Sequence, residues 1–228
     1  MIDTTTAKGR ILAAAFALAA ERPWAEVSVA DIADRAGVAL VDLKTAFDGK
    51  AAMLAEFSTL VDDEMLRRAP RRVPDQSTRD ALFEVIMSRF DALAPYRLAL
   101  KSIAASGPAD LGHLRAILNA QHWMLAAAGV PNDGAAGLAR AAGLATVYAS
   151  VFRTWLDDDD PGFARTMAAL DRRLRRGESA LNRFDDVCTG AQRLASSILP
   201  SLFGKKTKPS PPPTPEAPTA PAATPPVA

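Results

Sequence analysis

Few side chains in this sequence suit covalent catalysis. The 228 residues include two histidines and one cysteine, Cys188, which lies in an apolar stripe with no histidine nearby in the sequence. A thiol in that setting is typical of a structural cysteine. The sequence also lacks the nucleophile motif G-x-S-x-G, the zinc motif H-E-x-x-H and a phosphate-binding loop. We therefore predict a protein that is not an enzyme and that uses no cofactor and no metal.

Side chains with binding chemistry gather instead between residues 28 and 50. Lys44 and Thr45 are the polar, non-acidic residues at the centre of this segment, and Ser28, Arg35 and Lys50 flank them. Hydroxyl, guanidinium and ammonium groups are the donors that contact the phosphates and base edges of a duplex. These five residues are our candidate contacts to double-stranded DNA.

The elements that carry these residues have the pattern of a helix-turn-helix. A helix predicted at 8–21 precedes two short helices predicted at 29–35 and 39–46. Ser28 suits the N-cap of the second helix, and Gly37 suits a left-handed turn after it. Apolar residues then dock the third helix against the first two, and a longer helix is predicted from residue 50 to residue 64.

Over residues 8–56 the sequence resembles the TetR family of transcriptional regulators. The resemblance rests on three segments, Ile11–Glu21, Trp24–Val38 and Leu43–Leu54. It implies an all-α, TetR-like homodimer, with an N-terminal three-helix helix-turn-helix head and a larger C-terminal helical ligand and dimerisation domain. We place the head at 1–66 and the second domain at 67–204.

The recognition helix departs from the usual pattern of that family. Ala39, Leu40 and Ala46 cannot hydrogen-bond a phosphate or a purine edge through their side chains, and Asp42 would repel the phosphate backbone. Residues 1–60 hold six basic and eight acidic side chains, so the head carries a net charge of 6 − 8 = −2. An alternative is therefore a head that is kept for packing and no longer reads DNA.

Large apolar residues of the second domain could line a ligand pocket. The domain is predicted to contain helices at 77–93, 95–106, 110–128, 134–156, 161–182 and 184–203. An apolar ligand site needs bulky side chains and few polar groups. We expect it to be lined by Phe90, Trp123, Met124, Tyr148, Phe152 and Trp155. Asp157–Asp160, followed by Pro161, predicts a solvated turn that caps the next helix.

Within residues 132–173 the sequence is similar to TetR-fold lipid-binding proteins that assist ubiquinone biosynthesis. The similarity rests on Val147 and Tyr148, the aspartate run, and Leu170–Arg173. It implies an accessory protein with a membrane-touching terminal helix. An amphipathic pattern at 184–202, followed by three lysines, could form such a helix or pack on the body.

The composition limits the setting in which the protein works. A formal charge of +1 excludes polybasic proteins that bind nucleic acid through bulk charge. The N-terminus shows no signal sequence and no long uninterrupted apolar run, so we expect a cytoplasmic protein. Residues 205–228, rich in proline, alanine and threonine, predict a disordered tail. The leading hypothesis is a homodimeric regulator that binds DNA and an apolar ligand; the alternative is the lipid-binding accessory protein.

Overall fold

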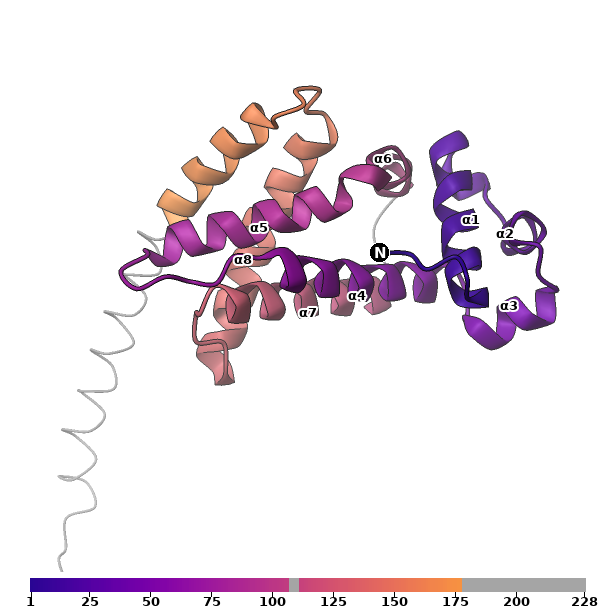
Figure 1. Cartoon of the computed structure of the whole chain (residues 1–228), viewed down its shortest axis with the longest axis horizontal. Helices are drawn as coiled ribbons and strands as arrows, with labels where there is room; N and C mark the ends of the chain where they lie inside the picture. Colours follow the sequence, from indigo (N-terminus) through magenta and orange to yellow (C-terminus); the bar gives the residue numbers. More distant parts are fainter. Residues whose placement is uncertain (107–110, 178–228) are drawn as a thin grey trace, which may run out of the picture. The chain divides into compact units, whose positions relative to one another are not determined.

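The computed structural model describes residues 1–106 and 111–177, and these residues form helices and no strand. The all-α fold class predicted from the sequence is confirmed. The helices follow each other along the chain as shown in Figure 1. They are α1 (Ala7–Glu21), α2 (Val29–Ala36), α3 (Leu40–Ala46), α4 (Lys50–Arg68), α5 (Thr78–Leu93), α6 (Arg97–Ala105), α7 (Leu111–Ala127) and α8 (Gly134–Leu156). A further helix begins at residue 164 and continues to residue 177.

The head is built on α1, which buries one broad apolar face. Thr6 caps this helix by accepting a hydrogen bond from the Gly9 amide at 3.0 Å. Ile11, Leu12 and Ala15 are almost completely buried, and α1 packs against α2, α3 and α6. Burial of such a face, more than the helix propensity of its alanines, stabilises a helix of this length.

Helix α4 is shared between the head and the body. The Phe57 ring packs at a tilt against that of Phe16 of α1, with centroids 3.9 Å apart, while Val61 and Met65 are buried further along the helix. The same helix packs against α5 and α7. A shift of α4 would therefore displace side chains packed against it in both the head and the body. The boundary expected at residue 66 stays a prediction, and α4 passes through it without a break.

The body contains α5 to α8 and the helix at 164–177. Contacts join α5 to α4 and α7, and α7 to α8. Helix α6 lies against α1 and is also in contact with α8. The helix ends predicted from the sequence lie within a few residues of those observed, and the one at 134–156 agrees at both ends. The predicted helix at 184–203, Cys188 and the tail at 205–228 lie outside the described residues.

Candidate nucleic-acid interface and ligand-domain core

A capping box and a left-handed glycine set the position of the candidate recognition helix α3. The Ser28 hydroxyl accepts a hydrogen bond from the Asp31 amide, and the Asp31 carboxylate accepts one from the Ser28 amide, so α2 begins at Val29. Gly37 ends α2 at φ 63° and ψ 40°, a conformation that costs glycine least. Helix α3 then docks through Leu43 and Phe47, which are 3% and 5% exposed.

Two of the predicted DNA contacts, Lys50 and Arg35, are bound to other groups of the head. The Lys50 ammonium donates hydrogen bonds to the carbonyl oxygens of Trp24, at 2.6 Å, and Val27, at 2.8 Å. It also lies 4.2 Å from the centroid of the Trp24 ring, and burial lowers the pKa of Lys50. The Arg35 guanidinium is paired with both carboxylate oxygens of Glu21. These cations fix η1 (Trp24–Glu26) to α4, and α2 to α1.

The other three predicted contacts are all exposed. Ser28 is exposed but serves as the N-cap of α2. The Thr45 hydroxyl donates to the Val41 carbonyl at 2.9 Å, so its proton is already used within α3. Lys44 is exposed and makes no hydrogen bond or ion pair with another described residue. The structure thus leaves the Lys44 ammonium as the one predicted contact on α3 with all of its donors available.

The outer face of α3 also carries a residue that we did not predict. Val41 is 67% exposed, and the adjacent Leu40 is 53% exposed. Val41 lies three residues before Lys44 and four before Thr45, which places it on the same helix face. The sequence alone could have identified it, because Leu43 and Phe47 suit the inward positions of this helix and Val41 falls between those positions.

Four of the six predicted ligand residues form one aromatic cluster in the body. Phe90 stacks on Tyr148 at 5.3 Å and on Trp155 at 5.4 Å, and Phe152 stacks on Tyr148 at 6.0 Å and on Trp155 at 5.5 Å. The edge of the cluster is Phe163, whose ring lies 6.4 Å from that of Trp155. Phe90 and Trp155 are completely buried.

The two predicted ligand residues of α7 differ in their surroundings. Met124 is completely buried in the core. Trp123 is 42% exposed, and its ring meets the edge of the His122 ring at 5.6 Å. The Nδ1 atom of His122 lies 3.1 Å from the side-chain amide nitrogen of Asn132.

A buried polar centre lies beside the aromatic cluster. Arg89 of α5 pairs with Asp62 of α4, donates to the Tyr148 hydroxyl of α8 at 3.2 Å and donates to the Ser58 hydroxyl at 3.3 Å. Asp62 and Arg89 are 4% and 5% exposed. Burial raises the pKa of Asp62, against the opposing effect of Arg89, and burial also raises the pKa of Tyr148. This centre ties three helices together at one point.

The sequence held a signal for this centre that we did not use. Arg89 lies on the apolar face of α5, together with Ile86, Phe90 and Leu93. Asp62 directly follows the buried Val61 on α4. A charged residue at such a position must find a partner of opposite charge or pay a large desolvation cost.

Two buried polar atoms in the body have no partner among the described residues. The Trp155 indole Nε1 lacks an acceptor inside the aromatic cluster, and the Gln121 side-chain oxygen of α7 lacks a donor. The Gln121 side chain is 1% exposed and donates its amide to the Ile117 carbonyl at 3.2 Å. An unsatisfied buried donor or acceptor costs about 1–3 kcal/mol, so both atoms are suited to binding a further polar group.

The aspartate run after α8 does cap the next helix, but its second member is buried rather than solvated. The Asp158 carboxylate accepts hydrogen bonds from the amide and the hydroxyl of Thr166 at 2.8 and 2.7 Å. Asp160 accepts from the Ala164 amide at 2.8 Å. Burial acts to raise the pKa of Asp158, but the hydrogen bonds from Thr166 and Asp160 outweigh it and lower the pKa. No cluster able to hold a metal ion occurs among the described residues.

Helix α6 joins this turn to the head. The Lys101 ammonium pairs with Asp157 at 2.6 Å, and Arg97 donates to the Asp158 carbonyl. On the opposite side, the Ser102 hydroxyl donates to the Arg22 carbonyl at 3.1 Å and accepts from the Trp24 amide at 2.9 Å. The end of α8 is thus connected to the end of α1 through side chains of α6.

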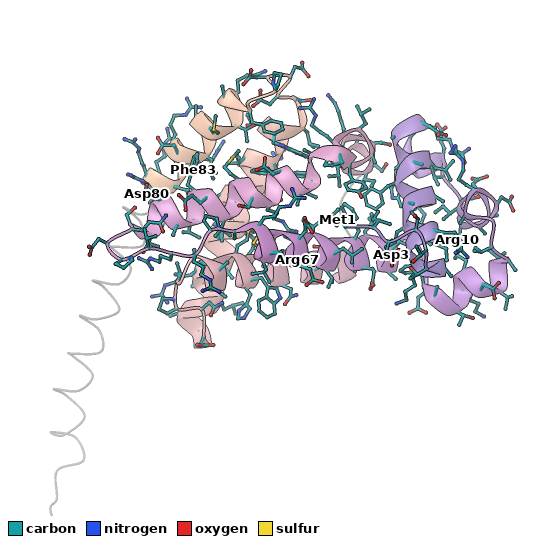
Figure 2. All side chains as sticks on the ribbon, viewed as in Figure 1. Met1, Asp3, Arg10, Arg67, Asp80 and Phe83 are labelled. Carbon is teal, nitrogen blue, oxygen red and sulfur yellow. The ribbon has the colours of Figure 1, made fainter. Side chains whose placement is uncertain are left out.

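Two open hollows occur on the surface, and the second reaches Phe163 at the edge of the aromatic cluster. One, of about 450 Å³, lies between the end of α1 and α6. The other, of about 520 Å³, lies between α5 and residues 161–167 and is lined in part by Phe83, which is labelled in Figure 2. Neither hollow is lined by any of the six predicted ligand residues, so the ligand site at those residues stays a prediction.

Comparison with known proteins agrees with the geometry of the head. Residues 11–57 match the sequence profile described as "Bacterial regulatory proteins, tetR family". The structure is also similar to that of a TetR transcriptional regulator from Nitrosomonas europaea ATCC 19718, with 24% identity, a TM-score of 0.59, and coverage of 75% of this chain and 97% of that one. The chain has the TetR fold.

Further comparisons extend the TetR likeness to the body. A TetR transcriptional regulator from Rhodococcus sp. RHA1 matches at 21% identity and a TM-score of 0.57, over 77% of this chain and 97% of that one. A regulator of the tetR family from Streptomyces coelicolor matches at 19% identity and a TM-score of 0.53, over 86% and 95%. Residues 138–180 match a second profile, COQ9. No curated protein sequence matches the chain.

Proposed function

We propose that the protein is a non-enzymatic transcriptional regulator that binds double-stranded DNA as a homodimer and responds to an apolar ligand. The observation that carries the proposal is the head: a capped α2, a left-handed Gly37 and an outward-facing α3, all within the segment that matches the tetR profile. A regulator of this kind works in the cytoplasm, without a cofactor or a metal. The ligand changes the spacing of the two heads and releases the duplex.

In this proposal the five predicted DNA residues act in two ways. Lys44 contacts the duplex directly. The Thr45 and Ser28 hydroxyls donate their protons to the Val41 carbonyl and the Asp31 carboxylate, so they can only accept hydrogen bonds, from the amino groups of bases. Arg35 and Lys50 hold α2 and α4 in place through Glu21 and the carbonyls of Trp24 and Val27. Lys8 and Arg10 of α1 add positive charge to the same head, and Arg10 projects from α1 in Figure 2.

The homodimer is supported by an uncovered apolar helix. Helix α8 is long and apolar enough to cross a membrane by length and composition alone, and only 22% of its most apolar window is buried. Leu138 is 65% exposed, and small residues such as Ala142 and Gly143 lie uncovered beside it. Small side chains let two helices approach closely. A second copy of the chain, packed on this face, would remove it from water.

The ligand site is proposed at the aromatic cluster. A ligand that wedges between α5 and α8 would contact Phe90, Tyr148 and Trp155, and an oxygen acceptor on it would satisfy the Trp155 indole N–H. Trp123, Met124 and Phe152 complete the proposed lining. Movement of α5 or α8 would be transmitted to α4 through the bonds of Arg89 to Asp62 and Tyr148.

The test is duplex binding by the full chain, measured as the fluorescence anisotropy of a labelled random-sequence DNA. It is done at about 50 mM salt, where non-specific binding is strong. We expect binding, and we expect Lys44→Ala to weaken it. Arg71→Ala is the matched control, because Arg71 is an exposed arginine outside the head. No binding by the wild-type chain, or equal weakening by both variants, would contradict the proposal.

A second candidate function is a lipid-binding accessory protein of the ubiquinone-biosynthesis type. The match of residues 138–180 to COQ9 favours it, together with the negative charge of the head. The terminal helix that would touch a membrane lies outside the described residues. Native mass spectrometry separates the two functions: a co-purifying lipid with no duplex binding supports the accessory role, and an empty protein that binds duplex opposes it.

A further inference from the structure

The first turn of α3 presents aliphatic side chains where a helix-turn-helix normally meets base edges. In this motif the N-terminal residues of the second helix reach into the major groove. Here those residues are Leu40, 53% exposed, and Val41, 67% exposed. A single exposed aliphatic residue on a protein surface needs no explanation. Leu40 and Val41, however, are adjacent and lie on the turn of α3 that would face the bases.

The hydrogen-bonding capacity left on this face is small. Ala39 and Ala46 have no polar side-chain atoms, and the Thr45 proton is given to the Val41 carbonyl at 2.9 Å. Asp42 can only accept, so it would suit a donor such as the cytosine amino group. Lys44 is the remaining side-chain donor on the exposed face of α3. Helix α3 has no arginine to pair with guanine and no asparagine or glutamine to pair with adenine, so apart from Lys44, Asp42 and the Thr45 hydroxyl oxygen its exposed side chains can contact bases only through apolar groups.

One base offers an apolar group in the major groove. The C5 methyl of thymine projects there, whereas cytosine, adenine and guanine present only donors and acceptors or a bare edge. Resting on the proposed function, we propose that Leu40 and Val41 read thymine methyl groups, so that each half-site of the operator carries thymines at fixed positions.

Helix geometry places these contacts beside the charged one. Leu40 precedes Lys44 by four residues, about 6 Å along the helix axis, which is close to two base-pair steps of 3.4 Å each. Val41 precedes Lys44 by three residues and shares its face. The aliphatic residues thus meet bases while Lys44 reaches the adjoining phosphates. The face is committed to duplex DNA rather than to a protein, because it lies on the segment that matches the tetR profile.

The experiment begins with selection of bound duplexes from a random pool by the full-length protein. The enriched duplex is then resynthesised with deoxyuridine in place of thymidine, one position at a time. Deoxyuridine keeps every hydrogen-bonding group and removes only the methyl. We expect fixed thymines in each half-site, and a loss of affinity of about fourfold for each contacted methyl, the worth of one buried group of that size.

Variants assign the effect to its residues. Leu40→Ala and Val41→Ala should weaken binding to the thymidine duplex and reduce the deoxyuridine effect, since the methyl then has no partner to lose. Leu98→Ala is the matched control, because Leu98 is 70% exposed on α6, outside the head. Both head positions are exposed, so the variants should melt at the wild-type temperature, which circular dichroism checks.

The possible results separate this proposal from the function on which it rests. A selected duplex whose affinity is unchanged by deoxyuridine, or by Leu40→Ala and Val41→Ala, overturns methyl reading and leaves DNA binding intact. Failure to bind any duplex at low salt overturns the proposed function and this inference together. The inference is supported if deoxyuridine lowers the affinity of the wild-type protein and this loss of affinity disappears in Leu40→Ala and in Val41→Ala.

Discussion

Replacement of Asp62 by alanine should destabilise the protein severely. Asp62 is the one anionic partner of the Arg89 guanidinium among the described residues, and both residues are about 95% buried. The remaining partners of Arg89, the hydroxyls of Tyr148 and Ser58, are neutral at physiological pH. Removal of one member of a buried ion pair costs about 3–5 kcal/mol, because an uncompensated charge is left in the core. A domain is stable by only about 5–15 kcal/mol.

Urea unfolding followed by circular dichroism measures this loss. The double variant Asp62→Leu with Arg89→Met is the control, since it removes both charges and fills the space with apolar atoms. We expect the double variant to be far more stable than Asp62→Ala, within about 1 kcal/mol of wild type or better. Two results would refute the argument that Asp62 compensates the buried charge of Arg89. One is a fall of less than about 1 kcal/mol in the free energy of unfolding of Asp62→Ala, and the other is a double variant less stable than Asp62→Ala.

Three further predictions concern the supports of the site. Gly37→Ala should cost about 1–2 kcal/mol in thermal unfolding for the left-handed backbone alone, because the open space around Gly37 gives an added Cβ nothing to strike; a neutral effect would contradict this. Lys50→Met should lower the melting temperature as well as any DNA affinity, since its ammonium binds two carbonyls of the head; lost affinity at unchanged stability would mean that Lys50 acts on DNA. Asp158, whose pKa is lowered below its ordinary 3.8, stabilises the fold above that pH, and this contribution is lost as the pH falls through the lowered value. Asp158→Asn should therefore remove part of the acid sensitivity seen by urea titration between pH 5 and about pH 2, and an unchanged pH profile would oppose it.

Local chemistry was enough to predict the helices and the turn. Ser28 and Gly37 mark the ends of α2 because a hydroxyl cap and a left-handed glycine act within a few residues of themselves. The aspartate run and Pro161 separate α8, which ends at Leu156, from the helix that begins at residue 164. These signals gave the helix-turn-helix and most helix ends.

The roles of individual side chains depended on partners far away in the sequence. Lys50 binds carbonyls 23 and 26 residues before it, and Arg89 pairs with a residue 27 positions before it. Neither pairing follows from composition or periodicity. Asp158 was expected in solvent but is buried, because its carboxylate binds Thr166 in the following helix. Pairings of this kind are set by how helices pack, so they become evident only in the folded chain.

The salt dependence of duplex binding tests the regulator proposal most directly. Three cations of each head, Lys8, Arg10 and Lys44, form no ion pair with a described carboxylate, so a homodimer offers six of them. Release of about 0.9 counterion for each neutralised phosphate predicts a slope of log K against log salt near −5, which becomes less steep by about 2 in Lys44→Ala. A slope near zero, or no binding at about 50 mM salt, would contradict the claim that the head of this TetR fold binds DNA.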